Sequence, residues 1–429
     1  MPKVVAFVPA KGSSERIPNK NLTVLDGEHL FKRKLRQLLE CSQIDEVYLD
    51  TDSDEIAALA ADLPCKRLQR PASLASNTTD GHELFSWECA QVDGDVYIQA
   101  LCTSPFVTAD TLARAVSTLL DTPTSDSLVA VTHAKQYTWE NGEPSYGRAR
   151  IPNSVELPRT TVEAMSLYIT RSSVLHARRR FGVSPIMFPL SPTEAVDVNW
   201  PDDLILAETI AAGSRAKQNL LIASLAPYLS SAMLSDITRE MGFAFTLPRE
   251  IRGNTRIFGR AKTMLLDRLQ PGEGTRGIYD ALGSYRFVRP GDVIVVENRA
   301  HDHAYFGNLN AQLAMRAGAV AAIIDGVTRD RSDVEKLGFP VFARGHYCVD
   351  IKNEGTVRSM NMPIMIGGVP INQGDFVYAD LDGVTIIPST MWPEVRLRAL
   401  KGIEKEWRVG MAVALGSDPQ EILVQLGEF

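Results

Sequence analysis

The sequence lacks several features that mark specialised classes of protein. It has only five cysteines in 429 residues, with no CxxC pair, so neither a disulfide framework nor a cysteine-based zinc site is expected. No apolar run reaches the ~18 residues that a membrane helix needs. Met1-Pro2-Lys3 leads directly into strand-like VVAFV without a signal-peptide pattern. We therefore expect a cytoplasmic protein with free thiols and no membrane partner.

An excess of positive charge is also absent. The net charge is -7 with a pI near 5.6, which argues against nucleic acid as a partner. Hydrophobic residues make up 45% and charged residues 23%, the ordinary balance of a globular protein. A chain of 429 residues exceeds one ordinary core, so two domains are expected, and any site for an anion must be local.

The first half of the chain alternates strand and helix patterns, which predicts an α/β fold with a mostly parallel sheet and helices on both faces. The expected strands are residues 4–10, 45–52, 95–101, 127–134 and 165–170. The expected helices are residues 30–42, 53–63, 109–121 and 202–212, the second of them capped by Ser53 or Asp54.

The second half has a different rhythm, and residues 211–220 are the best candidate for the boundary. Beyond it, short strands punctuated by glycine and proline alternate with helices, which predicts a second, compact α/β layer. The expected helices are 229–242, 308–318 and 396–413, and the expected strands are 291–297, 321–327, 340–345, 362–368 and 375–388.

The loop PAKGSSERIPNKN (residues 9–21) follows the first expected strand. A Gly/Ser turn after a parallel strand exposes backbone N–H groups, and cations beside them complete a cradle for phosphates. A solvated loop after an edge strand is the alternative. Four more polar motifs follow later strands, and in an open α/β sheet such strand ends meet in one crevice.

These motifs, taken in order, resemble a known family. The chain contains, in this order, PAKGSSERIPNKN, DTD, RPASLASN, QALCTSP and VDVNWPDDL. They are similar to the motifs of the acylneuraminate (CMP-sugar acid) cytidylyltransferases, which read PARxGSKRIPxKN, STD, RPxxLAxD, QPTSP and VDIDTPEDL. The resemblance covers residues 1–214. It implies a doubly wound, Rossmann-like nucleotidyltransferase sheet and transfer of CMP from CTP to a 2-keto-3-deoxy sugar acid or similar acid, with release of pyrophosphate.

The resemblance also implies roles for individual residues. Lys11 stands in the place of the family's arginine over the CTP phosphates, and it would act with Arg16 and Lys20. Mg²⁺ or Mn²⁺ would be held by Asp197 and Asn199. The nucleotide would be bound by Ala10, Lys11, Gly12, Ser13, Asn21, Arg70 and Gln99, and the acceptor by Gln99, Thr103 and Ser104.

The sequence departs from the family pattern at several places. Asn199 replaces a metal-binding aspartate, for which Asp202 or Asp203 could compensate, and Glu15 reverses the usual charge of the phosphate loop. Leu101 and Cys102 lengthen the spacing between the glutamine and TSP, and the segment EAMSLY (163–168) lacks an asparagine and a glycine that sialic acid enzymes often carry. The identity of the acceptor acid is therefore open.

A second candidate site lies in the C-terminal half. Gly307 begins a turn and helix, and Arg329-Asp330 follows a buried strand; arginine can bind a carboxylate while the aspartate holds a divalent cation. A salt-bridged strand end is the alternative. Residues 222–429 resemble the RraA-like family, which includes class II 4-hydroxy-4-methyl-2-oxoglutarate aldolases. Their pattern, a glycine turn, about twenty residues and Arg-Asp, is matched here with 21 residues between Gly307 and Arg329.

By this resemblance, Arg329 would grip the carboxylate of pyruvate or oxaloacetate, and Asp330 would position Mg²⁺. Gly307 and the backbone of Leu309 and Asn310 would complete the pocket. Asn308 stands where the family usually has an acidic residue, so the second domain is expected to be either an aldolase or decarboxylase or a non-catalytic oligomerisation or regulatory module. A further alternative is a first domain that binds nucleotide without transferring it. The relatives imply a homo-oligomer, with dimers through the first domain and trimers through the second, which together would build a hexamer or larger.

Overall fold

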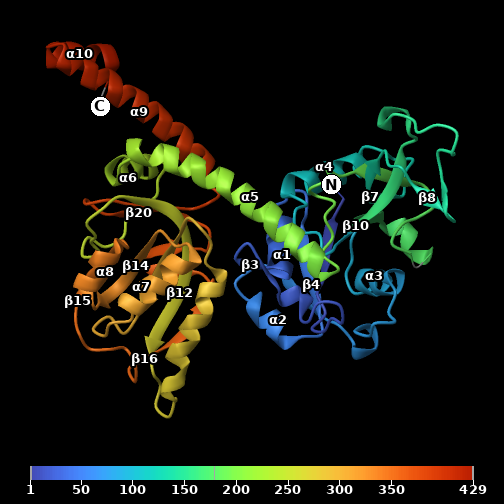
Figure 1. Ribbon diagram of the computed structural model, residues 1–429, viewed down its shortest axis with the longest axis horizontal. Helices are drawn as coiled ribbons and strands as arrows, with labels where there is room; N and C mark the ends of the chain where they lie inside the picture. Colours follow the sequence, from blue (N-terminus) through green and yellow to red (C-terminus); the bar gives the residue numbers. More distant parts are fainter. Residues whose placement is uncertain (1, 178, 428–429) are drawn as a thin grey trace. The chain divides into compact units, whose positions relative to one another are not determined.

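The computed structural model describes residues 2–177 and 179–427. The chain forms two compact units, Met1–Ala211 and Ala212–Phe429 (Figure 1). Helix α5 (Pro201–Leu225) contributes to both. The helix expected to end at residue 212 therefore continues for thirteen residues, so the region expected to be a boundary is helical. The domain limits 1–214 and 222–429 stay predictions.

The first unit is built on a seven-stranded sheet in the order β11-β7-β10-β6-β1-β4-β5. Strands β6, β1, β4 and β5 are parallel, as are β11 and β7, whereas β10 runs antiparallel to both of its neighbours. The strands are β1 (Val4–Pro9), β4 (Glu46–Thr51), β5 (Lys66–Gln69), β6 (Val96–Ala100), β7 (Ser127–Ala134), β10 (Thr160–Arg171) and β11 (Pro185–Pro189).

Helices cover both faces of this sheet, as expected. The side chains of β1 belong alternately to the hydrophobic cores on the two faces, because successive side chains of a strand point to opposite faces of the sheet. Val4, Ala6 and Val8 join the core formed with α1, α2, α4 and α5. Val5 and Phe7 pack with α3 instead. These helices are α1 (Leu30–Leu39), α2 (Asp54–Leu59, capped by the Ser53 side chain), α3 (Gly81–Ala90) and α4 (Ala109–Leu120).

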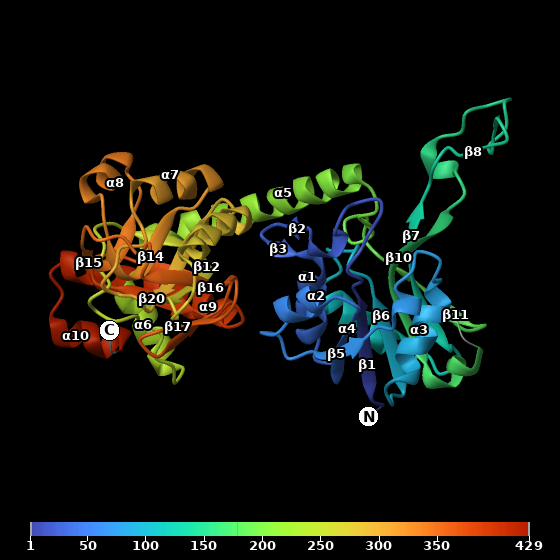
Figure 2. The same ribbon diagram turned by 90° about the horizontal axis from the view of Figure 1, so that it is seen from below.

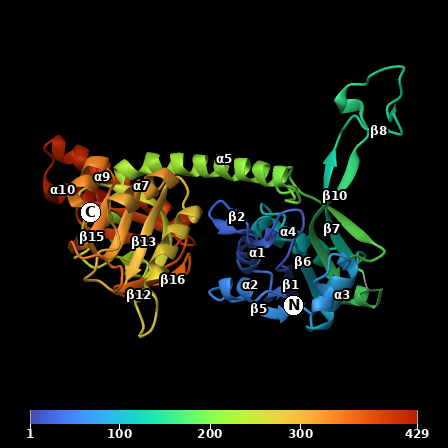
Figure 3. The ribbon, with the colours of Figure 1, turned by 60° about the horizontal axis from the view of Figure 1, so that its bottom comes forward.

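Short elements complete the first unit. Residues 135–159 leave the sheet between β7 and β10 as an arm, which Figures 2 and 3 show extending away from the sheet of this unit. The short elements are η1 (Lys20–Leu22), β2 (Val24–Leu25), β3 (Glu28–His29), η2 (Ala72–Leu74), β8 (Trp139–Glu140), β9 (Glu143–Pro144), η3 (Ser154–Glu156) and η4 (Ser172–Ala177).

The second unit is built on another seven-stranded sheet. Six strands follow the order β15-β14-β13-β12-β19-β20, and β16 pairs with β12. Strands β12 to β15 are parallel, and β16, β19 and β20 are antiparallel to their neighbours. The strands are β12 (Ile257–Arg268), β13 (Asp292–Asn298), β14 (Ala321–Thr328), β15 (Val341–His346), β16 (Gly355–Met360), β19 (Phe376–Ala379) and β20 (Val384–Ile387), with a separate hairpin of β17 (Ile364–Ile366) and β18 (Val369–Ile371).

The helices of the second unit pack in two groups. Helices α7, α8 and η6 cover one face of the sheet through residues such as Ala311 and Val334. The end of α5 packs with α6 and α9 around Phe258, Tyr378 and Trp392. These elements are η5 (Ala226–Tyr228), α6 (Ser231–Glu240), η6 (Thr275–Phe287), α7 (Asn308–Ala317), α8 (Arg331–Leu337), α9 (Trp392–Ala414) and α10 (Pro419–Leu426).

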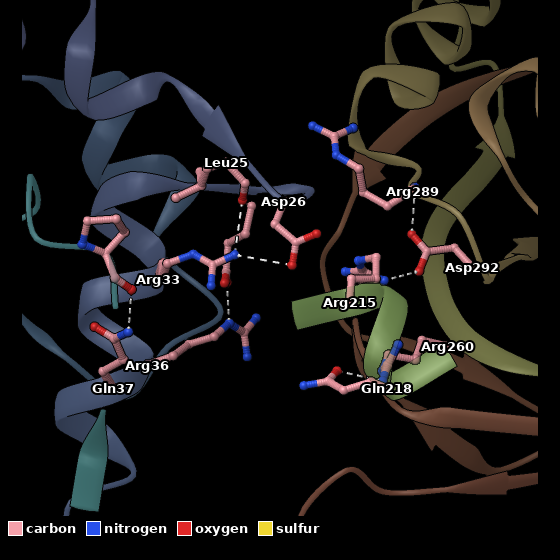
Figure 4. Close-up of polar contacts among 12 residues, drawn as sticks. Leu25, Asp26, Arg33, Arg36, Gln37, Arg215, Gln218, Arg260, Arg289 and Asp292 are labelled. Carbon is pink, nitrogen blue, oxygen red and sulfur yellow. Dashed lines mark hydrogen bonds and ion pairs between the residues drawn. The ribbon is translucent and has the colours of Figure 1, made fainter. Parts of the chain in front are cut away.

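Polar contacts attach α5 to the sheet of the second unit, as Figure 4 shows. Arg215 donates to the Asp292 carboxylate at 2.9 Å, and Arg260 donates to Gln218 at 2.7 Å. Asp292 is fully buried and also accepts the Arg289 backbone N–H at 2.9 Å. Burial raises the pKa of Asp292, although Lys262 and Arg215 oppose the rise. The ion pair therefore fixes the helix where the sequence suggested a linker.

Within the described residues, no single helix is long and apolar enough to cross a membrane. The helical segments Pro201–Tyr228 and Ser231–Glu240, bent by 99° relative to each other, have the required length and composition only when taken together.

Candidate active sites

One cavity of about 580 Å³ lies in the first unit beyond the ends of its central strands. It brings together most of the side chains expected to bind CTP, its acceptor and a metal. The predicted residues that line it are Lys11, Ser13, Arg16, Lys20, Asn21, Arg70, Thr103, Asp197 and Asn199. Ala10, Gly12, Gln99 and Ser104 do not line it.

The loop after β1 is held by hydrogen bonds from two sides. The Gly12 N–H donates to Asp52 at 2.9 Å, and the Asn21 side chain donates to the Lys11 carbonyl at 2.9 Å. A Cβ at Gly12 would lie 3.0 Å from the Cβ of Ser53, so the close approach of the loop to the start of α2 favours glycine there. Asn21 is thereby a support of the loop as well as a residue of the cavity wall.

Glu15, which reverses the charge expected at its position, has a hydrogen-bond partner in the cavity wall. Asn77 accepts a hydrogen bond from the Lys11 ammonium and donates one to the Glu15 carboxylate. Asn77 is the last residue of RPASLASN, where the family pattern has aspartate. A neutral amide can accept from the lysine and donate to the glutamate at once, which a carboxylate cannot do.

The other two cations of the loop face the segment before α5. The Arg16 guanidinium lies 5.4 Å from the centre of the Trp200 ring, and Lys20 donates to Asn199 at 3.2 Å. Burial, together with the nearby charge of Arg16, lowers the pKa of Lys20, while Asp197 opposes the shift. The cavity thus concentrates positive charge where a triphosphate is expected.

Asp197 is the carboxylate of this cavity that could hold a metal ion. Its Oδ1 has no hydrogen-bond partner, while Oδ2 accepts from the Asn199 amide, and burial raises its pKa. Asp203 accepts the backbone N–H groups of Asn199 and Trp200 at 2.9 and 2.8 Å, so it caps α5 rather than replacing the missing aspartate. No group of three or more acidic, histidine or cysteine side chains suited to a metal occurs among the described residues.

Arg70 and Gln99 belong to a buried network beneath the cavity. Arg70 donates to both oxygens of Asp50, with Nε at 2.9 and 3.0 Å. Gln99 is fully buried and donates to Glu88 at 2.5 Å. Burial, followed by the charge of Asp50, raises the pKa of Glu88 well above its ordinary range.

The position of Gln99 has a simple explanation in the spacing of QALCTSP. Counted back from Thr103, the second residue before it is Leu101, which is where QPTSP has its glutamine. Leu101 lines the cavity, and Gln99 lies one strand repeat deeper. The residues of the wall that sequence reasoning missed include Leu84 and Met165. Met165 lies in the segment EAMSLY, and Leu84 lies in none of the five motifs.

The second site is arranged around Asp330, which has φ 57°. Its Oδ2 accepts the Asn308 N–H at 3.1 Å. A Cβ at Gly307 would lie 2.5 Å from the same oxygen, so the close approach of Asp330 favours glycine at this turn. The expected Gly307 and Arg329-Asp330 are therefore brought together.

Arg329 is already paired with a carboxylate. Its Nη1 lies 2.6 Å from Asp350, and both line a cavity of about 570 Å³ together with Leu309 and Asn310. Tyr285 fixes Asn310 by donating to its side-chain oxygen at 3.0 Å. Arg329 also lines a neighbouring cavity of about 490 Å³. A substrate carboxylate would have to compete with Asp350 for this guanidinium.

Comparisons with known proteins agree with the division of the chain. Residues 5–198 match the family model described as cytidylyltransferase, and residues 231–386 match the one described as Aldolase/RraA. A putative 4-hydroxy-4-methyl-2-oxoglutarate aldolase of Halalkalibacterium halodurans is 31% identical over 154 residues, which are 36% of this chain and 70% of that protein. The CMP-N,N'-diacetyllegionaminic acid synthase of Legionella pneumophila is 26% identical over 227 residues, covering 48% of this chain and 96% of the synthase.

Among solved structures, an uncharacterized protein from Pseudomonas syringae pv. tomato covers 47% of this chain and 94% of its own, with 28% identity and a TM-score of 0.42. The family models and the relatives therefore assign the two units separately. The chain carries a cytidylyltransferase domain, which makes it a nucleotidyltransferase by family, and through its second unit it belongs to the RraA-like family.

Proposed function

We propose that the first unit transfers CMP from CTP to an acidic acceptor, a 2-keto-3-deoxy sugar acid or a similar acid, and releases pyrophosphate. The observation that carries this proposal is the single cavity in which Lys11, Arg16 and Lys20 face Asp197. Its cations match a triphosphate, and the buried Oδ1 of Asp197, which has no hydrogen-bond partner, matches a metal ion. The similarity to the CMP-N,N'-diacetyllegionaminic acid synthase supports the class of acceptor.

The residues of the cavity would act mainly by position and charge. In the reaction, the acceptor hydroxyl oxygen bonds to the α-phosphorus as the bond to the pyrophosphate oxygen breaks. Lys11, Arg16 and Lys20 would stabilise the charge that builds up on the phosphate oxygens. The Asp52 and Asn21 contacts would hold the loop ready, so that little reorganisation accompanies the reaction.

Mg²⁺ or Mn²⁺ fits the free oxygen of Asp197, with the Asn199 side-chain oxygen as a second ligand. When bound, such an ion would supply charge neutralisation at the phosphates. Asn199 brings no negative charge and its oxygen accepts from Lys20, so the protein's hold on the ion would be weaker than with two carboxylates.

Pyrophosphate release with CTP, measured across a panel of 2-keto acids, tests this proposal. The Lys20→Met variant should lose at least about tenfold in kcat, since a developing charge loses its partner. Lys66→Met is the matched control, because Lys66 of β5 pairs with Glu46 of β4 and lies outside the cavity. Release that depends on no acid, or that survives unchanged in Lys20→Met, would contradict the proposal.

For the second unit we propose binding and cleavage or decarboxylation of a 2-keto acid such as oxaloacetate, with Arg329 on the carboxylate and Asp330 toward Mg²⁺. The juxtaposition of Gly307 with Asp330 supports it. The rival, a non-catalytic oligomerisation or regulatory module, is favoured by Asn308 and by the Arg329–Asp350 pair. We also propose that the protein forms homo-oligomers, with dimers through the first unit and trimers through the second. We propose a cytoplasmic location for it.

Pyruvate release coupled to lactate dehydrogenase separates the two readings. Arg329→Ala should abolish release, and Arg398→Ala on α9, whose side chain pairs with Glu394, should leave it unchanged. An absence of release from the unaltered protein across 2-keto acids, with and without Mg²⁺, would favour the non-catalytic module.

A further inference from the structure

The cavity of the first unit has an apolar part that the nucleotide chemistry does not use. Leu101 follows β6, and Met165 belongs to β10; both line the cavity. The Leu101 N–H donates to the Ser166 carbonyl at 2.9 Å, which places Leu101 beside the residue that follows Met165. The Tyr168 hydroxyl, which donates to Glu163, lies 3.1 Å from the Met165 sulfur, and Tyr168 belongs to the apolar cluster against which Leu101 packs. Leu101 and Met165 therefore form one patch.

Leu84 of α3 extends this patch. Glu88, one helical turn later on the same face of α3, contacts Gln99 at 2.5 Å. Leu101 lies two residues after Gln99, so its side chain points to the same face of the sheet. Leu84 and Leu101 each lie one repeat beyond the Glu88–Gln99 contact on their own elements, and both line the cavity. We call Leu84, Leu101 and Met165 the apolar wall.

Met165 is held in the wall by an unusual backbone. Its φ is 47°, in the left-handed region, and every other non-glycine residue with positive φ in the described part of the chain is asparagine or aspartate. The pairing of β10 with β7 shifts register between Glu163 and Tyr168, at this point. A bulky side chain kept in a strained conformation at a cavity is typical of a functional site. The strain directs Met165 to this position.

The apolar wall adjoins the predicted centre of reaction. Thr103, two residues after Leu101, lies beside Asp197, because its carbonyl accepts the Val198 N–H at 2.8 Å. The phosphate-binding cations lie instead on the loop after β1 and beside Asn77 and Trp200. A nucleotide whose triphosphate occupies that loop leaves the apolar wall to the acceptor.

We propose that Leu84, Leu101 and Met165 determine acceptor specificity, and that they select an acid that turns methyl or methylene groups, rather than a polyhydroxylated chain, toward them. This inference rests on the proposed CMP transfer. Hydroxyl groups against the apolar wall would lose water without gaining a hydrogen-bond partner, whereas methyl groups would gain apolar contact. The acceptor class is thus a partly deoxygenated 2-keto acid.

The test uses two 2-keto-3-deoxy acids that differ only in ending with a methyl or a hydroxymethyl group. The unaltered enzyme should favour the methyl acid by about tenfold or more in kcat/KM. Leu101→Gln should lower that ratio by about tenfold while leaving the KM for CTP unchanged, since the amide supplies partners for a hydroxyl. Leu101→Met should keep the ratio and shows that the position tolerates substitution.

Met187→Gln is the matched control. Met187 is 49% exposed, close to the 43% of Met165, and lies on β11 outside the cavity. The Met187→Gln variant should show the same ratio of kcat/KM for the two acids as the unaltered enzyme. A change at Met187 as large as at Leu101 would show a general effect and overturn the inference.

Two outcomes separate this inference from the proposed function. If CTP releases pyrophosphate with both acids equally, or if Leu101→Gln changes only the KM for CTP, CMP transfer stands and the apolar wall contacts something other than the acceptor. If neither acid supports release, their binding to the CTP-loaded enzyme is measured by calorimetry. Equal binding, or none, overturns the inference even where CTP itself binds.

Discussion

The buried network of Asp50, Arg70, Glu88 and Gln99 favours a protonated Glu88, because burial and the charge of Asp50 raise the pKa of this carboxyl group. Two fully buried carboxyl groups, Asp50 and Glu88, lie near a single guanidinium, that of Arg70, which donates to Asp50 alone; Glu88 Oε1 has no donor partner. A proton on Glu88, given to Asp50 as a hydrogen bond, satisfies both groups. The protonated glutamic acid then holds Asp50, and through it Arg70, at the cavity wall.

A Glu88→Gln substitution should therefore be tolerated, because its amide can donate to Asp50 and accept from Gln99. The pKa of Glu88 is raised by folding, so unfolding releases a proton once the pH exceeds the ordinary value of 4.5. The free energy of unfolding of the unaltered protein then falls, by up to about 1.4 kcal/mol per pH unit, until the raised pKa is reached. Glu88→Gln removes this loss.

The advantage of the glutamine variant should accordingly grow as the pH rises above 4.5, measured by urea unfolding. Glu83→Gln on the same helix is the control, since Glu83 is outside the network. An advantage that does not change with pH would mean that Glu88 is ionised in the folded protein.

Lys34 is a second buried ionisable group, and in the described structure no hydrogen bond stabilises its charged form. Its side chain is 1% exposed, its Nζ has no hydrogen-bond partner, and burial lowers its pKa to about 7. A Lys34→Met substitution should raise the free energy of unfolding at neutral pH by about 1–4 kcal/mol. The gain should shrink as the pH rises from 7 toward 10.5, where the unfolded lysine also becomes neutral. A destabilised variant in urea unfolding would reveal an unrecognised role for the amine.

Single residues also mark how far the sequence alone could lead. The motifs identified the cavity, because their order and their places at strand ends follow from the α/β pattern. They did not identify which residue of QALCTSP faces it, since an insertion of two residues moves Gln99 by one strand repeat and leaves Leu101 in its place. The αL conformation of Met165 has no signal in the sequence, because asparagine and glycine are the usual residues there.

At the scale of elements, charge within apolar segments explains the main differences from expectation. Strand β12 was not predicted, because Arg260 and Lys262 interrupt its apolar pattern. Helix α5 was expected to end near Gly213, since glycine and the polar residues after it are typical of a linker. Buried Asp292 accounts for the unpredicted strand β12 and for the longer helix α5. Its carboxylate lies 4.0 Å from the Lys262 ammonium of β12 and accepts a hydrogen bond from Arg215 of α5. Tertiary pairing of this kind cannot be read from local patterns.

The start of α5 connects an element to the site. Asp203 accepts two backbone N–H groups there and thereby fixes Asn199 and Trp200. An Asp203→Ala substitution should lower the free energy of unfolding by about 1 kcal/mol, because two backbone N–H groups lose their acceptor. It should also raise the KM for CTP, because Trp200 lies against Arg16 and Asn199 against Lys20.

Asp202→Ala is the control for the cap, since Asp202 is exposed in the first turn of the same helix. Urea unfolding and pyrophosphate release give the two readouts. If Asp203→Ala lowers stability without changing the KM for CTP, the cap does not position the cavity wall.

At the scale of the whole molecule, each unit has its own sheet and its own buried clusters. The cores around β1 involve residues of the first unit alone, and those around β12 and β13 involve residues of the second alone. Units with separate cores unfold as separate cooperative transitions when little energy couples them. The chemistry is divided in the same way, because each candidate cavity is lined by residues of one unit.

Calorimetry should therefore resolve two unfolding transitions that respond to different changes. Lys34→Met and added CTP should both raise the transition of the first unit, the latter because a ligand stabilises only the state that binds it. Asp292→Ala should lower the other transition, by an amount that corresponds to about 3–5 kcal/mol, because it leaves Arg215 and Lys262 without their buried carboxylate. A single transition moved by all three changes would show that α5 couples the two units into one cooperative structure, and the two activities would then have to be interpreted together.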